Sequence, residues 1–111
     1  MINRSHRLST KQFMEVMEKG KMTHSPFFLL RSFIGKEGVN IATVAPKKVA
    51  PTAVLRNNTR RRIYEAIRPM LGSMVPGTRA IVFAKSEAIK ASTKDISTDL
   101  KSLFSKAKIG V

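Results

Sequence analysis

The sequence predicts an α+β fold, a two-layer sandwich in which helices pack on one small central sheet. Three observations favour this fold class. Residues 27–34, 39–45 and 80–84 are apolar stretches with strand composition. A basic helical stretch separates the second of them from the third. Amphipathic helices are expected on either side of this group. The expected order is helix, two strands, helix, strand, helix.

Length and composition indicate one domain over residues 1–111, with 42% hydrophobic residues for a modest core. The chain has no cysteine, which excludes disulfides and thiolate chemistry. No run approaches the roughly 18 apolar residues of a membrane-spanning helix, and no signal-peptide pattern opens the sequence. We therefore expect a cytoplasmic protein that does not act at a membrane.

Basic residues dominate the charge. Lys and Arg number 21 against 7 Asp and Glu, which gives a formal net charge of +14. The isoelectric point is about 11.1. Such an excess indicates a polyanionic partner, bound with release of counterions from a phosphate backbone. An anionic membrane is the other candidate, but a chain with three strands and a core does not suit a membrane-active amphipathic peptide.

The first helix is expected over residues 10–19. Ser9 is a good N-cap, and Gln12 is placed to complete a capping box. Gly20 stands where a left-handed C-cap belongs. Core packing is the simplest role for its apolar stripe, which consists of Phe13, Val16 and Met17.

The first two strands are joined by a turn at residues 36–38, and residues 21–24 are compatible with a further short strand. Alternation along the first strand puts Phe28 and Leu30 on one face, with Phe27 and Leu29 on the other. One face must meet helices, while the other is available as a platform for unstacked bases. Taken alone, the residues favour core positions for all four side chains.

A basic helix is expected from Ala53 onward, because no Gly or Pro interrupts the stretch before Pro69. One stripe of this helix suits a core and contains Thr59, Ile63, Ala66, Ile67 and Met70. The adjacent stripe suits solvent or phosphate and contains Arg56, Asn57, Arg60, Arg61 and Arg68. An ordinary solvated helix face explains the arginines equally well.

A connector over residues 70–78 leads to the short strand at residues 80–84, which is expected to be buried. A polar linker then reaches Ser92, an N-cap with Asp95 three residues on. The last helix covers the sheet with an apolar stripe of Ile96, Leu100, Leu103, Phe104 and Ala107.

The basic stretch resembles the signature of the bacterial ribonuclease P protein component. That family shows a Lys-Lys pair at the end of a strand, then a helix with Ala-Val, Arg-Asn-Arg, Lys-Arg and Arg-Glu. The residues that match are Lys47, Lys48, Ala53, Val54, Arg56, Asn57, Arg60, Arg61 and Glu65. Asn58 and Tyr64 stand where Arg is usual, and Met17 and Leu30 stand where relatives have aromatics. The resemblance extends over nearly the whole chain.

The resemblance implies a left-handed crossover through the basic helix, against the usual right-handed rule. It implies the protein subunit of an endoribonuclease that removes the 5′ leader of precursor tRNA to give the mature 5′ end. The large RNA subunit would carry the active site and most of the Mg²⁺. The protein would bind that RNA and the leader, as a monomer in a 1:1 ribonucleoprotein.

The resemblance also implies roles for individual residues. Contacts to RNA would come from Lys47, Lys48, Arg56, Asn57, Arg60, Arg61, Arg62 and Arg68. Contacts to the leader would come from Phe13, Met17, Phe28 and Leu30.

We expect no catalytic or metal site in the protein itself. His6 and His24 are isolated, and no Cys or HExxH pattern supplies metal ligands. Asp95 and Asp99 lie one helical turn apart, a spacing that is common on exposed helices. A structural RNA-binding protein of the ribosomal type would explain the charge, the size and the missing catalytic groups equally well. It would not explain the ordered spacing of the Lys-Lys, Arg-Asn and Arg-Arg pairs.

Overall fold

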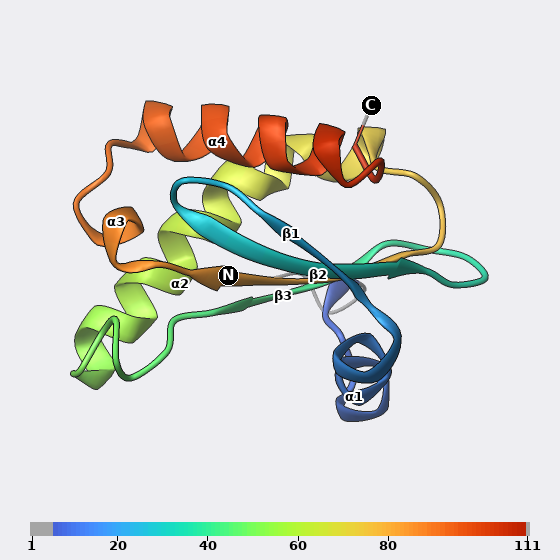
Figure 1. Ribbon diagram of the computed structural model, residues 1–111, viewed down its shortest axis with the longest axis horizontal. Helices are drawn as coiled ribbons and strands as arrows, with labels where there is room; N and C mark the ends of the chain where they lie inside the picture. Colours follow the sequence, from blue (N-terminus) through green and yellow to red (C-terminus); the bar gives the residue numbers. More distant parts are fainter. Residues whose placement is uncertain (1–5, 111) are drawn as a thin grey trace.

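The computed structural model describes residues 6–110 (Figure 1). In chain order the elements are α1 (Thr10–Lys19), β1 (Lys21–His24), β2 (Phe28–Ile34), β3 (Asn40–Val44), α2 (Ala53–Ile67), the 3-10 helix η2 (Arg68–Ser73), β4 (Thr78–Ala84), α3 (Ser86–Ile89) and α4 (Thr93–Lys106).

The strands form one four-stranded sheet in the order β1-β2-β4-β3. β2 lies antiparallel to both β1 and β4, whereas β3 and β4 run parallel. The chain reaches β4 from β3 through α2, so this parallel pair is joined by a helical crossover. The α+β fold class is confirmed, and the left hand of the crossover stays a prediction.

Two helices cover one face of the sheet, and α1 packs on the other (Figure 1). The larger core lies under α2 and α4 and includes Phe28, Leu30, Ile41, Ile63 and Leu100, each fully buried. Burying a side chain of this size stabilises the fold by about 1.5–3 kcal/mol. A smaller cluster under α1 contains Leu8, Val16 and Ile81, with half-buried aromatic and aliphatic side chains around it.

Side-chain caps fix where the longer helices begin. The Ser9 hydroxyl accepts from the Gln12 N–H at 3.2 Å, and the Gln12 side chain accepts from the Ser9 N–H at 2.8 Å. The predicted capping box is therefore confirmed. Ser92 caps α4 by accepting from the Asp95 N–H at 3.1 Å. Thr52, which the sequence analysis did not single out, caps α2 by accepting from the Leu55 N–H at 3.1 Å.

The prediction of a left-handed cap at Gly20 was wrong. Its φ and ψ are −68° and 141°, an extended conformation, and its N–H donates to Val16 O at 2.8 Å. Glycine is needed there because the backbone of residue 20 approaches the Val16 carbonyl closely, and an added Cβ would lie 2.4 Å from that oxygen. A positive φ does occur at Gly77, where φ is 92° and a Cβ would lie 2.4 Å from Gly35 O.

Other differences from the expected elements are small. The short strand β1 is present, and β4 begins two residues early, at Thr78. The linker expected after β4 contains a short helix, α3, which Arg62 of α2 fixes in place. Its guanidinium donates to Ile89 O at 3.1 Å and also to Ala91 O. None of the described helices has the length and apolar character needed to cross a membrane.

Arg62→Ala is expected to lower the free energy of unfolding by about 1.5–3 kcal/mol, the range for hydrogen bonds that involve a charged group. The half-buried guanidinium links α2 to one carbonyl at the end of α3 and to another two residues beyond it. Denaturant unfolding of this variant and of Arg61→Ala, an exposed neighbour, measures the effect. The control should stay within about 0.5 kcal/mol of the parent. Equal stability of the two variants would contradict this role.

Candidate nucleic-acid interface

The sheet face on which α1 packs, here called the α1 face, is only partly covered. Residues paired across strands lie on the same face, so the register places Leu29, Arg31 and Phe33 opposite Phe83, Ile81 and Arg79. Half-buried side chains surround the small cluster under α1, namely Phe13, Phe33, Ala42, Val44 and Phe83. The α1 face therefore presents aromatic and aliphatic surface next to solvent.

The assignment of Phe28 and Leu30 to a leader-binding surface was wrong. Both side chains are 0% exposed and belong to the core under α2 and α4. The two faces of β2 were interchanged in that assignment, and the half-buried Leu29 and Arg31 stand on the α1 face instead. A side chain sealed between a sheet and two helices makes no contact with RNA.

Phe13 and Met17 do lie beside this surface. Phe13 is half-buried against the cluster under α1, and Met17, one turn further along the helix, is 42% exposed. Arg31 holds the end of this helix to the sheet, since its Nη1 donates to Met17 O at 2.9 Å. A cation at a helix C-terminus is favourable because the last carbonyls carry partial negative charge.

The arginines of α2 fall into two groups. Arg56 donates to Ala50 O and Pro51 O, both at 3.1 Å, and so closes the loop before the helix. Arg62 holds α3, and Arg68 forms an exposed ion pair with Glu65 at 3.3 Å. Their predicted RNA contacts stay predictions, and their partners are backbone carbonyls or a carboxylate. The second group, Arg60 and Arg61, has asparagine side chains as partners instead.

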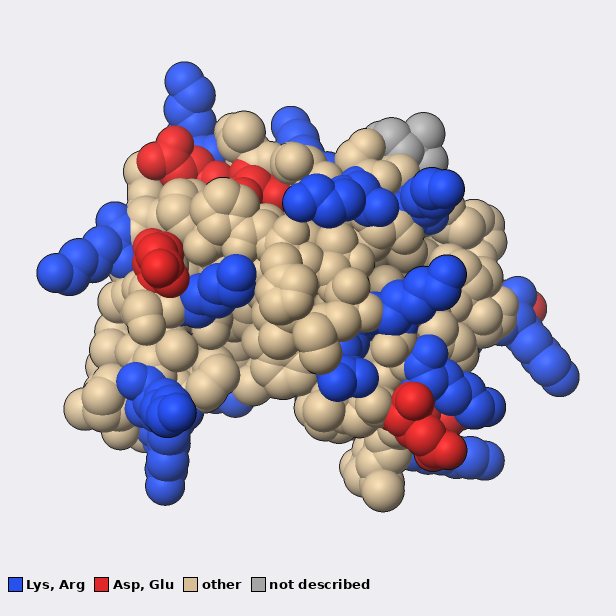
Figure 2. Space-filling view, viewed as in Figure 1, with Lys and Arg blue, Asp and Glu red and all other residues tan. Residues whose placement is uncertain are grey.

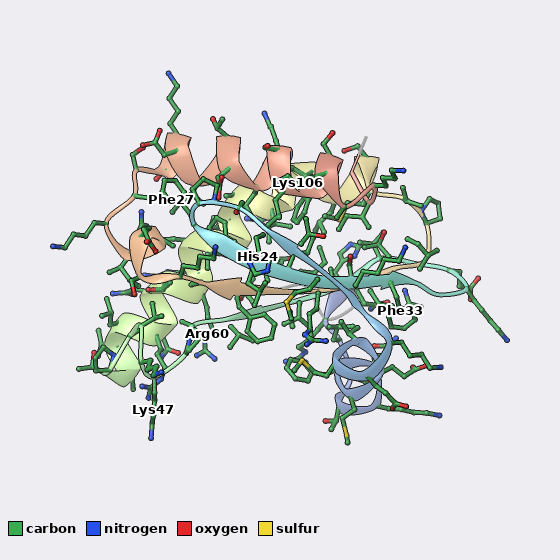
Figure 3. All side chains as sticks on the ribbon, viewed as in Figure 1. His24, Phe27, Phe33, Lys47, Arg60 and Lys106 are labelled. Carbon is green, nitrogen blue, oxygen red and sulfur yellow. The ribbon has the colours of Figure 1, made fainter. Side chains whose placement is uncertain are left out.

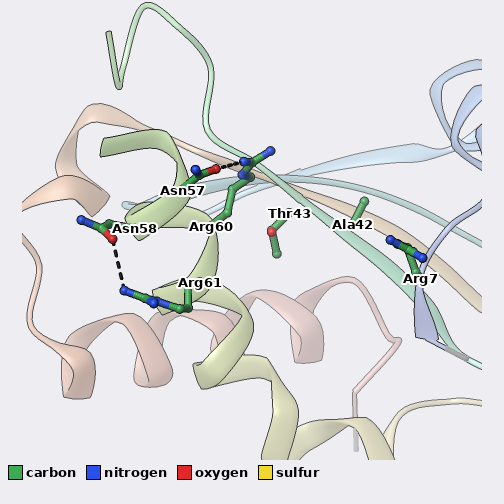
Figure 4. A pocket seen from close by; sticks show the side chains of 7 residues that line it. All are labelled: Arg7, Ala42, Thr43, Asn57, Asn58, Arg60 and Arg61. Atoms are coloured by element: carbon green, nitrogen blue, oxygen red, sulfur yellow. Dashed lines mark hydrogen bonds between the residues drawn. The ribbon is translucent and has the colours of Figure 1, made fainter. Parts of the chain in front are cut away.

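Arg60 and Arg61 each pair with an asparagine three residues earlier on α2 (Figure 4). Arg60 donates to Asn57 Oδ1, and Arg61 Nη2 donates to Asn58 Oδ1 at 3.2 Å. Asn58 therefore orients Arg61, although the related family usually has Arg at that position. Tyr64, the other departure, is only 3% exposed and lies in the packing layer, not in the solvent-facing stripe.

A pocket of about 590 Å³ lies between α2 and β3, with Arg7 across from the helix (Figure 4). Arg7 is brought there because it forms a parallel bridge with Ile41, and its carbonyl accepts from Asn40 Nδ2 at 3.3 Å. The pocket is lined by Arg7, Ala42, Thr43, Asn57, Asn58, Arg60 and Arg61.

Sequence reasoning found Asn57, Arg60 and Arg61 but missed Arg7 and Thr43 as their neighbours. In the sequence alone, Arg7 adds only to the overall positive charge. Its place beside β3 depends on a bridge between residues 34 positions apart, which the sequence pattern does not reveal.

The charge on this side continues into the loop between β3 and α2. Lys47 and Lys48 are exposed, in a turn closed by Val49 N–H donating to Pro46 O at 2.9 Å. Figure 3 shows Lys47 and Arg60 at the α2 end of the molecule and Phe33 beside α1. In Figure 2 the lower outline of the molecule recedes between the α2 end and α1.

Within residues 6–110, no group of three or more His, Asp or Glu side chains is placed to hold a metal ion. Asp99, half of the acidic pair noted in the sequence, accepts from Ser25 Oγ at 2.6 Å and from the Phe27 N–H at 3.1 Å. Its carboxylate therefore fastens the β1–β2 turn to α4.

Comparison with known proteins identifies the family. The family model described as Ribonuclease P matches residues 2–108. The chain belongs to the bacterial ribonuclease P protein family. It is thus the protein component of an endoribonuclease that processes tRNA, and its partner in the ribonucleoprotein is the RNA of ribonuclease P. This membership favours the ribonuclease P interpretation over a ribosomal-type protein.

Individual relatives span the same length as this ribonuclease P protein. The component from Pseudanabaena sp. is 27% identical, and the match covers 98% of this chain and 97% of that protein. The component from Microcystis aeruginosa is 32% identical, covering 94% and 92%. The solved Staphylococcus aureus RNase P protein has a TM-score of 0.82 at 22% identity, covering 96% and 98%. The Thermotoga maritima protein has a TM-score of 0.79 at 18% identity, covering 90% and 96%. These solved structures share the fold.

Proposed function

We propose that this protein binds the catalytic RNA through the arginine pocket and the Lys47–Lys48 loop, and the 5′ leader of precursor tRNA on the α1 face. One observation carries the proposal: the two surfaces are continuous. Ala42 lines the arginine pocket and also packs in the cluster under α1. A single RNA-bound molecule therefore presents phosphate-binding and base-binding surface side by side.

The α1 face has the chemistry for an unpaired strand. Aromatic side chains that are half-buried keep one surface against the sheet and offer the rest to a ligand, as Phe13, Phe33 and Phe83 do. Stacking of a base on a good aromatic platform is worth roughly 1–3 kcal/mol. Arg31 adds a fixed positive charge on the same face for a phosphate of that strand.

The protein contributes binding and orientation in this account. Hydrolysis of a phosphodiester requires an activated water, and Mg²⁺ held mainly by the RNA subunit would supply it. Precursor tRNA as substrate, a 1:1 ribonucleoprotein with one protein molecule, and a cytoplasmic location belong to the same proposal. We also propose that residues 1–111 form a single RNA-binding domain.

The protein alone is expected to leave precursor tRNA intact in the presence of Mg²⁺. It should increase cleavage at the mature 5′ end when a ribonuclease P RNA is added, because its surfaces bind RNA and leader together. Gel analysis of the 5′ leader released over time measures this, with RNA alone and protein alone as controls. Robust Mg²⁺-dependent cleavage by RNA-free protein would contradict the proposal.

Met17→Phe is expected to tighten holoenzyme binding of precursor tRNA by up to about tenfold, because an aromatic ring adds stacking area beside Phe13. Met17 is 42% exposed, so the larger ring needs no repacking of the core. Affinity for mature tRNA, which lacks a leader, should not change. Met14→Phe is the matched control, since Met14 is 66% exposed and, two residues before the buried Val16, lies on the opposite side of the same helix. Equal effects of the two variants, or equal effects on both tRNA forms, would place the leader elsewhere.

A further inference from the structure

The pocket between α2 and β3 has the size and charge of a site for one small anionic group. Its volume of about 590 Å³ lies within the range of ligand pockets, roughly 300–1,000 Å³. Arg7, Arg60 and Arg61 supply positive charge from two sides, and none of the described residues that line it carries a carboxylate. The methyl group of Ala42 gives the pocket an apolar surface.

The hydrogen-bonding character of the pocket follows from the two Asn–Arg pairs. A guanidinium only donates hydrogen bonds, so each asparagine must turn its carbonyl oxygen to its arginine. Asn57 Oδ1 and Asn58 Oδ1 thereby each accept from an arginine, which uses one of the two acceptor positions of each oxygen. The Nδ2 groups of both amides are donors, and the arginines add further donors. The wall formed by α2 is therefore rich in donors and selects a ligand rich in acceptors.

Nucleotides differ in how many hydrogen-bond acceptors they offer to the donors of α2. Every nucleotide brings phosphate oxygens, which accept from arginine. Guanine also offers O6 and N7 as two acceptors, and uracil offers carbonyl oxygens, whereas adenine combines its N7 acceptor with an exocyclic amino donor and cytosine has an amino donor in place of the keto oxygen. We propose that this pocket binds one unpaired nucleotide of an RNA, with a keto-bearing base, guanine or uracil.

The nucleotide has to be unpaired because the pocket is concave. It lies between the outer edge of a strand and the side of a helix (Figure 4). A base inside a double-stranded RNA helix is stacked between its neighbours. Proteins reach the edges of RNA bases freely only in bulges, loops and ends. This inference rests on the proposed function, since the pocket is part of the surface assigned there to the catalytic RNA.

The experiment uses the full chain and short two-stranded RNAs that differ only at one bulged nucleotide, which is G, U, A or C, beside a fully paired duplex. Fluorescence anisotropy gives the affinity of each at one salt concentration. The G and U bulges are expected to bind about tenfold tighter than the A and C bulges and the paired duplex. A contact that distinguishes one base edge from another gives discrimination of this size.

Variants assign the preference to the pocket. Asn57→Ala and Asn58→Ala should bring the ratio of G-bulge to A-bulge affinity close to one, because each removes a directed donor and frees its arginine. Arg68→Ala is the matched control: it removes one exposed charge from the end of the same helix and lies outside the pocket. It should weaken all the RNAs alike and leave the ratio unchanged. Thermal unfolding checks that each variant is folded.

Two results would overturn the inference: equal affinity for bulged and paired RNAs, or a base preference that both asparagine variants retain. Restoration of precursor cleavage by the same protein preparations separates this outcome from failure of the proposed function. Restored cleavage without a bulge preference removes the inference and leaves the function standing. A bulge preference that depends on the asparagines supports the inference even if cleavage is not restored.

Discussion

The packing of α2 and α4 on one face of the sheet is the constraint on which the rest of the structure depends. It seals Phe28 and Leu30 into the core and leaves their neighbours Leu29 and Arg31 on the other face. Because side chains alternate along a strand, this choice of face decides which residues of every strand can meet a ligand. It also sets α2 beside β3, where its arginines meet Arg7 across the pocket.

Positive charge serves two purposes in this protein. Arg56 and Arg62 donate to backbone carbonyls, so they hold the loop before α2 and the segment around α3. Arg60 and Arg61 donate to asparagine side chains and remain exposed. The net charge of +14 attracts RNA at long range, whereas these fixed guanidiniums determine which surface of the protein the RNA contacts.

Local features were predictable from the sequence where local physics decides them. The capping box of Ser9 and the beginnings of α1, α2 and α4 follow from side chains within one turn of each helix. The exposed face of β2 was not predictable in this way, since apolar residues occupy both of its faces. Periodicity cannot choose between two apolar faces, and the helices that cover one of them come much later in the chain.

The candidate site likewise has features that the sequence reveals and features that only distant contacts determine. Its Arg-Asn and Arg-Arg spacing was visible in the sequence, whereas the partners of Arg62 lie 27 and 29 residues away and those of Arg7 lie on β3. The role of Gly20 also escaped prediction, because a close approach to a carbonyl and a left-handed turn both favour glycine. Contacts distant in sequence decide which of several plausible roles a residue has.

Directed cleavage of bound RNA tests the central claim most directly, and the absence of natural cysteine makes it practical. A single cysteine carrying a hydroxyl-radical source would be placed at Met17 beside the α1 face, at Val54 on α2, or at Lys94 on the outer side of α4. In a complex with ribonuclease P RNA and precursor tRNA, the probe at Met17 should cut the leader. The probe at Val54 should cut the large RNA, and the probe at Lys94 should cut neither. Strong cleavage from Lys94, with none from Met17 or Val54, would show that RNA binds the opposite side of the protein.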